Sequence, residues 1–135
     1  MKPETTAFLQ KAQEFLDKAQ AMVAMPWPDE AGRAAYLAGF HAAQALIFER
    51  QGRALKTHSG VQAEFARLVK DDPRFDLALR RFLGRAYNLK AVADYETGPG
   101  SHIAPEQATE AIQTARHFLD TVREVLSDTG ATRDD

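Results

Sequence analysis

The 135-residue sequence contains no cysteine. This absence excludes a disulfide-stabilised scaffold, a zinc site with thiolate ligands, an iron–sulfur cluster and a cysteine nucleophile. Proline and glycine are also scarce, with six and eight residues. One or the other stands at most of the joints between apolar repeats, which is where helices end and begin.

The sequence also lacks a long uncharged apolar run. The first twenty residues include Lys2 and Asp17, so they predict no secretory signal peptide. The longest uncharged stretch inside a helical pattern, residues 34–48, contains His41 and Gln44. It is shorter than the roughly 20 residues that a membrane-spanning helix needs. We therefore expect a cytoplasmic protein without a membrane segment.

Charge is unevenly distributed along the chain. Residues 50–90 hold ten Lys/Arg against four Asp/Glu (net +6), whereas the rest of the chain holds seven against fifteen (net −8). A basic segment in an otherwise acidic chain suggests an anionic ligand. The alternative is a solvated helix face whose charges are balanced by acidic neighbours in the fold.

Apolar residues recur at three- and four-residue steps along the whole chain, which predicts helices and no strands. Thr5 or Thr6 can cap the first helix. The expected helices are 5–24, 28–51, 58–71, 75–95 and 104–126. The expected core residues are Phe15, Tyr36, Phe40, Ile47, Phe82, Leu89, Phe118 and Val122.

These helices, joined by short connections, favour an all-α fold: an antiparallel, up-and-down bundle of four to five helices. Apolar residues make up 44% of the chain and charged residues 27%, which is typical of one folded domain. We expect that domain over residues 1–126, followed by a polar, frayed tail over 127–135.

Familiar ligand motifs are missing from the sequence. It contains no G-x-x-x-x-G-K-[ST] phosphate loop and no H-E-x-x-H zinc pair. The four histidines, at positions 41, 58, 102 and 117, are widely separated. We therefore expect neither a metal nor a cofactor. A helix-turn-helix regulator of DNA is the least favoured interpretation, because the short third helix shows no evident base-reading face.

Three segments carry the most specific pattern. Residues 36–46 read Y-x-A-x-F-H-A-A-x-A-L, residues 57–61 read T-H-x-G-V, and residues 88–95 end in Ala-Asp-Tyr. In this order and spacing they resemble the HEPN family of helical domains, and above all its small prokaryotic single-domain members. The likeness extends from Phe8 to about Val125.

The resemblance implies a four- to five-helix bundle that is usually dimeric. Many members of the family are, or resemble, toxins of two-gene modules whose partner is a small nucleotidyltransferase. Members with nuclease activity cut RNA without a metal, using a motif of Arg, four to six residues, and His from both subunits. The resemblance therefore implies three partners: a second copy, RNA or a nucleotide, and a nucleotidyltransferase.

The corresponding stretch of this chain departs from that motif, because it reads Lys90-Ala-Val-Ala-Asp94-Tyr95. Lysine stands near the arginine position and can balance phosphate charge, but without the bidentate fork of arginine. Tyrosine stands near the histidine position and is a poor base, with an ordinary pKa of about 10 against about 6.5 for histidine. Lys90, Asp94 and Tyr95 are thus the candidate catalytic residues of a weakened, metal-independent endoribonuclease.

Four further residues are candidates for ligand binding. Arg81 and Arg85 share a helix face and could follow phosphates, and His41 or His58 could supply the missing imidazole. Each also has a structural interpretation: a solvated face for the arginines, a hydrogen-bonded core histidine at 41, and a helix cap at 58.

Two functions therefore remain open. The first is a toxin-like protein that engages RNA or nucleotides, with or without residual nuclease activity. The second is a non-catalytic helical scaffold that binds a partner or a nucleotide. Lys90 and Asp94 would then be a surface ion pair at i, i+4 spacing.

Overall fold

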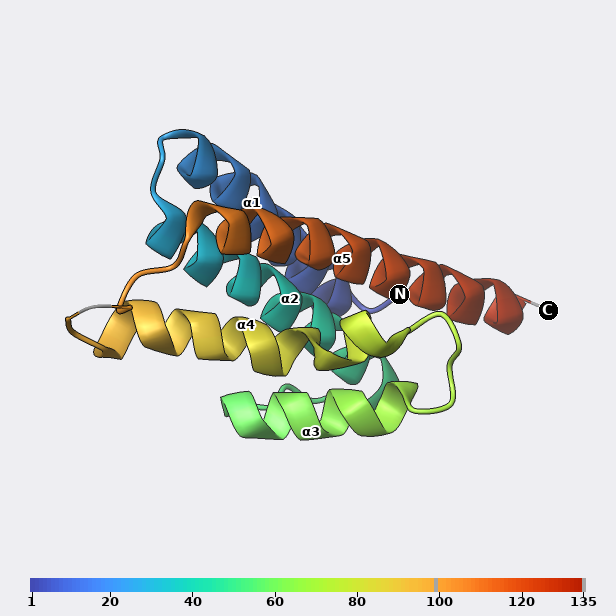
Figure 1. The fold of residues 1–135 in the computed structure, drawn as a ribbon. Coiled ribbons are helices and arrows are strands. Elements are labelled where there is room, and N and C mark those ends of the chain that lie inside the picture. Colours follow the sequence, from blue (N-terminus) through green and yellow to red (C-terminus); the bar gives the residue numbers. More distant parts are fainter. Residues whose placement is uncertain (99, 135) are drawn as a thin grey trace.

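The computed structural model describes residues 1–98 and 100–134, the last six of these through their backbone alone. Within this range the chain forms five helices and no strand, packed as a bundle (Figure 1). The helices are α1 (Pro3–Ala24), α2 (Pro28–Gln51), α3 (His58–Val69), α4 (Leu77–Tyr95) and α5 (Pro105–Asp134). The predicted all-α bundle is confirmed. The frayed tail predicted for 127–135 lies mostly outside the described side chains and stays a prediction.

Most helix ends follow the local signals in the sequence. Gly52 caps the C-terminal end of α2, and its φ of 73° is in the left-handed region that glycine adopts without strain. The Thr57 side chain accepts a hydrogen bond from the Gly60 amide (3.0 Å) and caps α3. The Asp76 carboxylate accepts one from the Leu79 amide (3.0 Å) and caps α4.

The start of α1 differs from the prediction that Thr5 or Thr6 caps it. The helix begins at Pro3, and the buried Thr5 hydroxyl donates instead to Oε1 of Glu49 (3.0 Å). The Lys2 amide donates to the same oxygen (2.9 Å), and Nζ of Lys2 donates to the Glu49 carbonyl (2.8 Å). A threonine that would cap by local contact therefore joins the start of α1 to the end of α2.

The four long helices, α1, α2, α4 and α5, alternate in direction, but α3 runs parallel to α2 (Figure 1). Residues 52–57 return along α2, and Nε2 of Gln44 donates to the Leu55 carbonyl within this return segment (3.2 Å). The start of α3 therefore lies at the same end of the bundle as the N-terminal half of α2 and the C-terminal end of α4.

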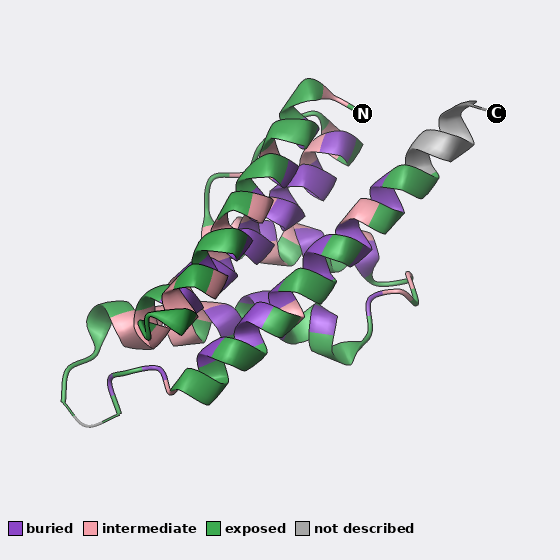
Figure 2. Cartoon of the chain, turned by 90° about the horizontal axis from the view of Figure 1, so that it is seen from above, coloured by how far each residue is buried: buried purple, intermediate pink, exposed green. Residues whose placement is uncertain are grey.

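Helix α2 is the centre of the bundle and contacts each of the other four helices. Its small residues between 34 and 45 are buried within the chain, and Figure 2 marks the buried residues along the helices. Of the predicted core residues, Phe15 and Leu89 are half-buried and the other six are buried. Among the residues described, no helix is long and apolar enough to cross a bilayer.

Candidate functional site

Three charged side chains form an ion network at the C-terminal end of α4. Lys90 and Asp94 are one helical turn apart, and Nζ of Lys90 lies 2.9 Å from Oδ2 of Asp94. Arg33 of α2 bonds the other oxygen through Nε (2.7 Å) and Nη2 (2.5 Å). The side chains are 15%, 18% and 34% exposed for Lys90, Asp94 and Arg33. Two cations face one carboxylate, so these three side chains sum to +1, and the Asp29 carboxylate also lies within reach of the Arg33 charge.

The network keeps its charges near neutral pH. Burial raises the pKa of Asp94, but the hydrogen bonds from Lys90 and Arg33 outweigh burial and leave this pKa below its ordinary value. The hydrogen bond to Asp94 raises the pKa of Lys90. The exposed Tyr95 ring has its centroid 5.2 Å from Nζ of Lys90, so it lies beside the same cation.

His58, the first residue of α3, is held by a buried tyrosine. Its Nδ1 lies 2.6 Å from the hydroxyl oxygen of Tyr36. Burial raises the pKa of Tyr36 to about 12, so Tyr36 keeps its hydroxyl proton. The Gln62 side chain also hydrogen-bonds to Tyr36. The Gln62 amide donates to the phenol oxygen, so we assign the Tyr36 hydroxyl as the donor and Nδ1 of His58 as the acceptor of their hydrogen bond. Neutral His58 then carries its own proton on Nε2.

His58 also lies within the electrostatic field of Lys90. Burial lowers the pKa of His58, and the positive charge of Lys90 lowers it further. The Tyr87 ring lies near both groups, with its centroid 5.2 Å from the imidazole centroid and 5.8 Å from Nζ of Lys90. The imidazole at this end of the bundle is therefore neutral at pH 7.

His41 lies elsewhere, on the side of α2 that faces α1. Its ring stacks on Phe15, with centroids 5.4 Å apart and planes 14° from parallel, and lies 6.4 Å from the Phe8 ring. Its Nδ1–H donates to Oε1 of Gln44 (2.8 Å). Burial lowers the pKa of His41. Of the two histidines considered as a source of the missing imidazole, the structure brings only His58 to Lys90.

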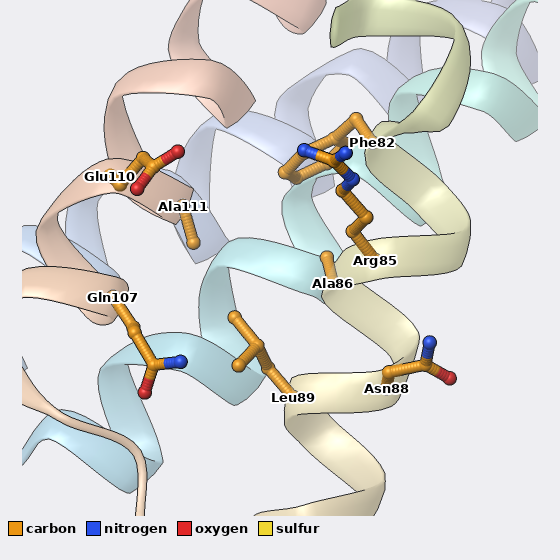
Figure 3. Close-up of a pocket in the computed structure, with 8 residues that line it drawn as sticks. All are labelled: Phe82, Arg85, Ala86, Asn88, Leu89, Gln107, Glu110 and Ala111. Atoms are coloured by element: carbon orange, nitrogen blue, oxygen red, sulfur yellow. The ribbon is translucent and has the colours of Figure 1, made fainter.

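The two candidate arginines lie on another face of α4. Arg85 lines a groove of about 340 Å³ between α4 and α5, together with Phe82, Leu89 and Glu110 (Figure 3). Arg81, one turn earlier, is exposed on the same face. Lys90 follows Arg85 by five residues, which is about 140° around an α-helix. The structure therefore does not bring the arginines together with Lys90, Asp94 and Tyr95.

Four residues of this cluster carry roles that the sequence did not reveal. Tyr87 stands three residues before Lys90, so helical spacing could have placed it on the same face. Arg33 pairs with a residue 61 positions later, and Tyr36 with one 22 positions later. Gln62 reaches Tyr36 from a different helix. No local pattern signals such pairings.

The described part of the chain holds no group of three His, Cys, Asp or Glu side chains that could share a metal ion. The groups at the end of α4 are instead ammonium, guanidinium, imidazole, phenol and amide, with the Asp94 carboxylate held by the two cations. These groups suit an anionic, polar ligand.

The comparison with known families places the whole bundle in one class. The family model of the HEPN domain matches residues 5–125, so the chain belongs to the HEPN domain family. This membership confirms the resemblance found in the three sequence segments.

Two relatives come from Methanocaldococcus jannaschii. The protein named "Putative toxin MJ0605" is 27% identical over 128 residues, which cover 95% of this chain and 92% of the relative. The protein named "Putative toxin MJ0142" is 26% identical over 125 residues, covering 93% of this chain and 83% of the relative.

Proposed function

We propose that this protein is the toxin-like member of a two-gene module and binds RNA or a nucleotide by its phosphate at Lys90. The observation that carries the proposal is the network of Lys90, Asp94 and Arg33, which holds an excess positive charge beside the neutral imidazole of His58. The names of the two archaeal relatives support the toxin-like role. The protein acts in the cytoplasm with a nucleotidyltransferase partner.

Each residue of the site has a distinct part in phosphate binding. The Lys90 ammonium has three N–H donors, and its hydrogen bonds to Asp94 and to the Tyr95 side chain use two of them, which leaves one for a phosphate oxygen. Asp94 positions the ammonium and does not itself contact an anion. The exposed Tyr95 hydroxyl donates a further hydrogen bond to the phosphate from the adjacent side.

The same site supports slow RNA cleavage. The ribose 2′-oxygen attacks the adjacent phosphorus, the new O2′–P bond forms and the P–O5′ bond breaks. A base must accept the 2′ proton, and an acid must give a proton to the leaving 5′ oxygen. Tyr95 is a poor base, and neutral His58 presents an N–H rather than a free nitrogen to solvent. A site without efficient proton transfer forgoes about 10²–10⁴-fold in rate.

We propose a homodimer on the pattern of the family. The small residues between 34 and 45 would allow a second copy to approach closely, but they are buried against other helices of the same chain. The second subunit would therefore approach another surface. Light scattering at micromolar concentration measures the mass directly, and a monomer throughout that range contradicts the dimer.

The test is metal-free cleavage and binding of a mixed RNA pool, with EDTA present. We expect weak cleavage by the wild type, stronger cleavage by Tyr95→His, and weaker RNA binding by Lys90→Ala. Lys70→Ala, which removes an exposed lysine at the other end of α3, is the matched control and should behave as the wild type. Brisk wild-type cleavage that Lys90→Ala leaves unchanged would show that the site lies elsewhere.

The second candidate is a binding scaffold without chemistry, and the tyrosine at position 95 favours it. It predicts no cleavage and no RNA binding by any variant, with partner binding intact. Co-expression with a small nucleotidyltransferase encoded by an adjacent gene tests the partner. We expect the two proteins to purify together, and separate elution contradicts the two-gene module.

A further inference from the structure

We propose that a hollow beside Lys90, lined by His58, Ser59, Gln62 and Tyr87, binds the base of a ribonucleotide. The phosphate of that nucleotide lies at Lys90, so the inference rests on the proposed function. It adds a base-recognition subsite between the first turns of α3 and the middle of α4.

The hollow has the size of a small ligand pocket. Its volume is about 340 Å³, near the lower end of the roughly 300–1,000 Å³ of ligand pockets. One planar heteroaromatic ring fits such a space. The Tyr87 ring forms one of its walls and is held by the rings of Tyr36 (centroids 5.6 Å apart, edge to face) and His58 (5.2 Å). This support fixes an aromatic surface for stacking before a ligand arrives.

The lining groups suit the edge of a base. Nε2–H of His58 is a donor, and the Ser59 hydroxyl can donate or accept. The Gln62 amide gives one N–H to Tyr36, which leaves its oxygen and a second N–H for a ligand. Proteins read single-stranded RNA by this combination of aromatic stacking and hydrogen bonds to base edges.

The distribution of charge separates the two parts of the ligand. The four lining residues are neutral at pH 7, because the pKa of His58 is lowered by burial and by Lys90. The excess positive charge lies next to them, in the network of Lys90, Asp94 and Arg33. Tyr87 links the two parts, since Nζ of Lys90 is 5.8 Å from its ring centroid. A neutral ring joined to a phosphate matches this arrangement.

The test measures binding of AMP, GMP, CMP and UMP against ribose 5-phosphate, which has the phosphate but no base. We expect at least one nucleotide to bind the wild type about tenfold more tightly than ribose 5-phosphate, since stacking of a base on an aromatic ring strengthens binding. Tyr87→Leu should remove this difference, and Tyr87→Phe, which keeps the ring, should retain it. Gln62→Ala should reduce discrimination among the four bases, whereas Gln113→Ala on the exposed face of α5 should not.

Chemical-shift mapping tests the location of the base subsite. It uses the wild-type protein, so it does not depend on the folding of a variant. The shifts that depend on the base should appear at residues 58–62 and at Tyr87. Base-dependent shifts at Arg85 and Glu110, in the groove between α4 and α5, would overturn the assignment. A single-stranded RNA of the preferred base separates the sources of the ligand: tighter binding than the mononucleotide identifies RNA, and equal binding identifies a free nucleotide.

The failures of the two proposals can be told apart. Ribose 5-phosphate and all four nucleotides could bind with equal affinity, and Lys90→Ala could weaken the binding of each. That result would support the phosphate site at Lys90 and contradict the base subsite. If neither nucleotides nor RNA bind to the wild type, both proposals are wrong.

Discussion

Gly39 on α2 faces the ring of Phe82 on α4 so closely that a Cβ atom at position 39 would overlap the edge of that ring. This contact brings the middle of α2 against the N-terminal third of α4. The same approach allows Arg33, nearly two turns earlier on α2, to reach Asp94 near the end of α4. The packing of the core thus sets the geometry of the ion network.

We predict that Gly39→Ala destabilises the protein. The added methyl group forces the Phe82 ring or a helix to move, and overpacking of a core typically costs about 1–3 kcal/mol. Gly84→Ala is the matched control, because no atom lies within 4 Å of the new methyl group. The control should gain up to about 1 kcal/mol from helix propensity. Urea unfolding measures both, and a Gly39→Ala protein as stable as the wild type would refute the close contact.

We predict that Lys90→Ala raises the pKa of His58. The charge of Lys90 adds to burial in lowering that pKa, so its removal should return the pKa part of the way to 6.5. An NMR titration of the imidazole measures it. Lys11→Ala is the control, because the Lys11 charge lowers the pKa of His41 instead. Equal responses of His58 to both variants would mean that Lys90 and His58 do not share a site.

We predict that Tyr36→Phe lowers the free energy of unfolding by roughly 1–3 kcal/mol, the cost of leaving buried polar partners without a hydrogen bond. The lost hydroxyl leaves Nδ1 of His58 and the Gln62 amide unpaired. Tyr95 is 73% exposed, so Tyr95→Phe removes a hydroxyl at the surface. It should change the free energy of unfolding by less than about 0.5 kcal/mol. Thermal or urea unfolding of both variants checks the contrast.

We predict that Asp72 contributes to acid sensitivity. Hydrogen bonds from Arg74 lower the pKa of Asp72 below 3.8 and outweigh burial, which acts in the opposite direction. The folded state therefore gains stability from the ionised carboxylate above about pH 3.8, and loses it as the pH falls through the lower pKa of the folded state. Asp72→Asn should flatten this part of the stability curve, whereas Asp71→Asn, at an exposed neighbour, should leave it unchanged. Unfolding measured from pH 6 to 2.5 gives the comparison.

The sequence predicted the helices well because their signals are local. Apolar spacing, Gly52 and the prolines near the helix joints mark the helix ends within about two residues, except that α5 continues to Asp134 where the sequence predicted an end at 126. The start of α1 shows where such signals fail. Thr5 has the chemistry of a cap, but a buried carboxylate 44 residues away offers its hydroxyl a better partner.

The candidate site was predictable only in part for the same reason. Lys90, Asp94 and Tyr95 follow one another on one helix, so their proximity could be read from spacing. The position of His58 depends on the direction of α3, which no residue within α3 determines. Arg85 is positively charged and lies on the same helix as Lys90. The two residues are five positions apart, however, so their side chains leave α4 in different directions. The domain limits at residues 1 and 126 stay a prediction.

The length of residues 52–57 limits where α3 can begin. His58 contacts Tyr36, which stands 15 residues before Gln51 at the end of α2, a distance of about 22 Å along the helix at 1.5 Å per residue. Residues 52–57 are six residues, which reach about 20 Å when extended. The segment is therefore only just long enough to carry the chain back before α3 begins. Loss of one residue would pull His58 about 3 Å from Tyr36, whereas an added residue can bulge into solvent. Residues 52–57 should therefore tolerate the insertion of a residue but not a deletion.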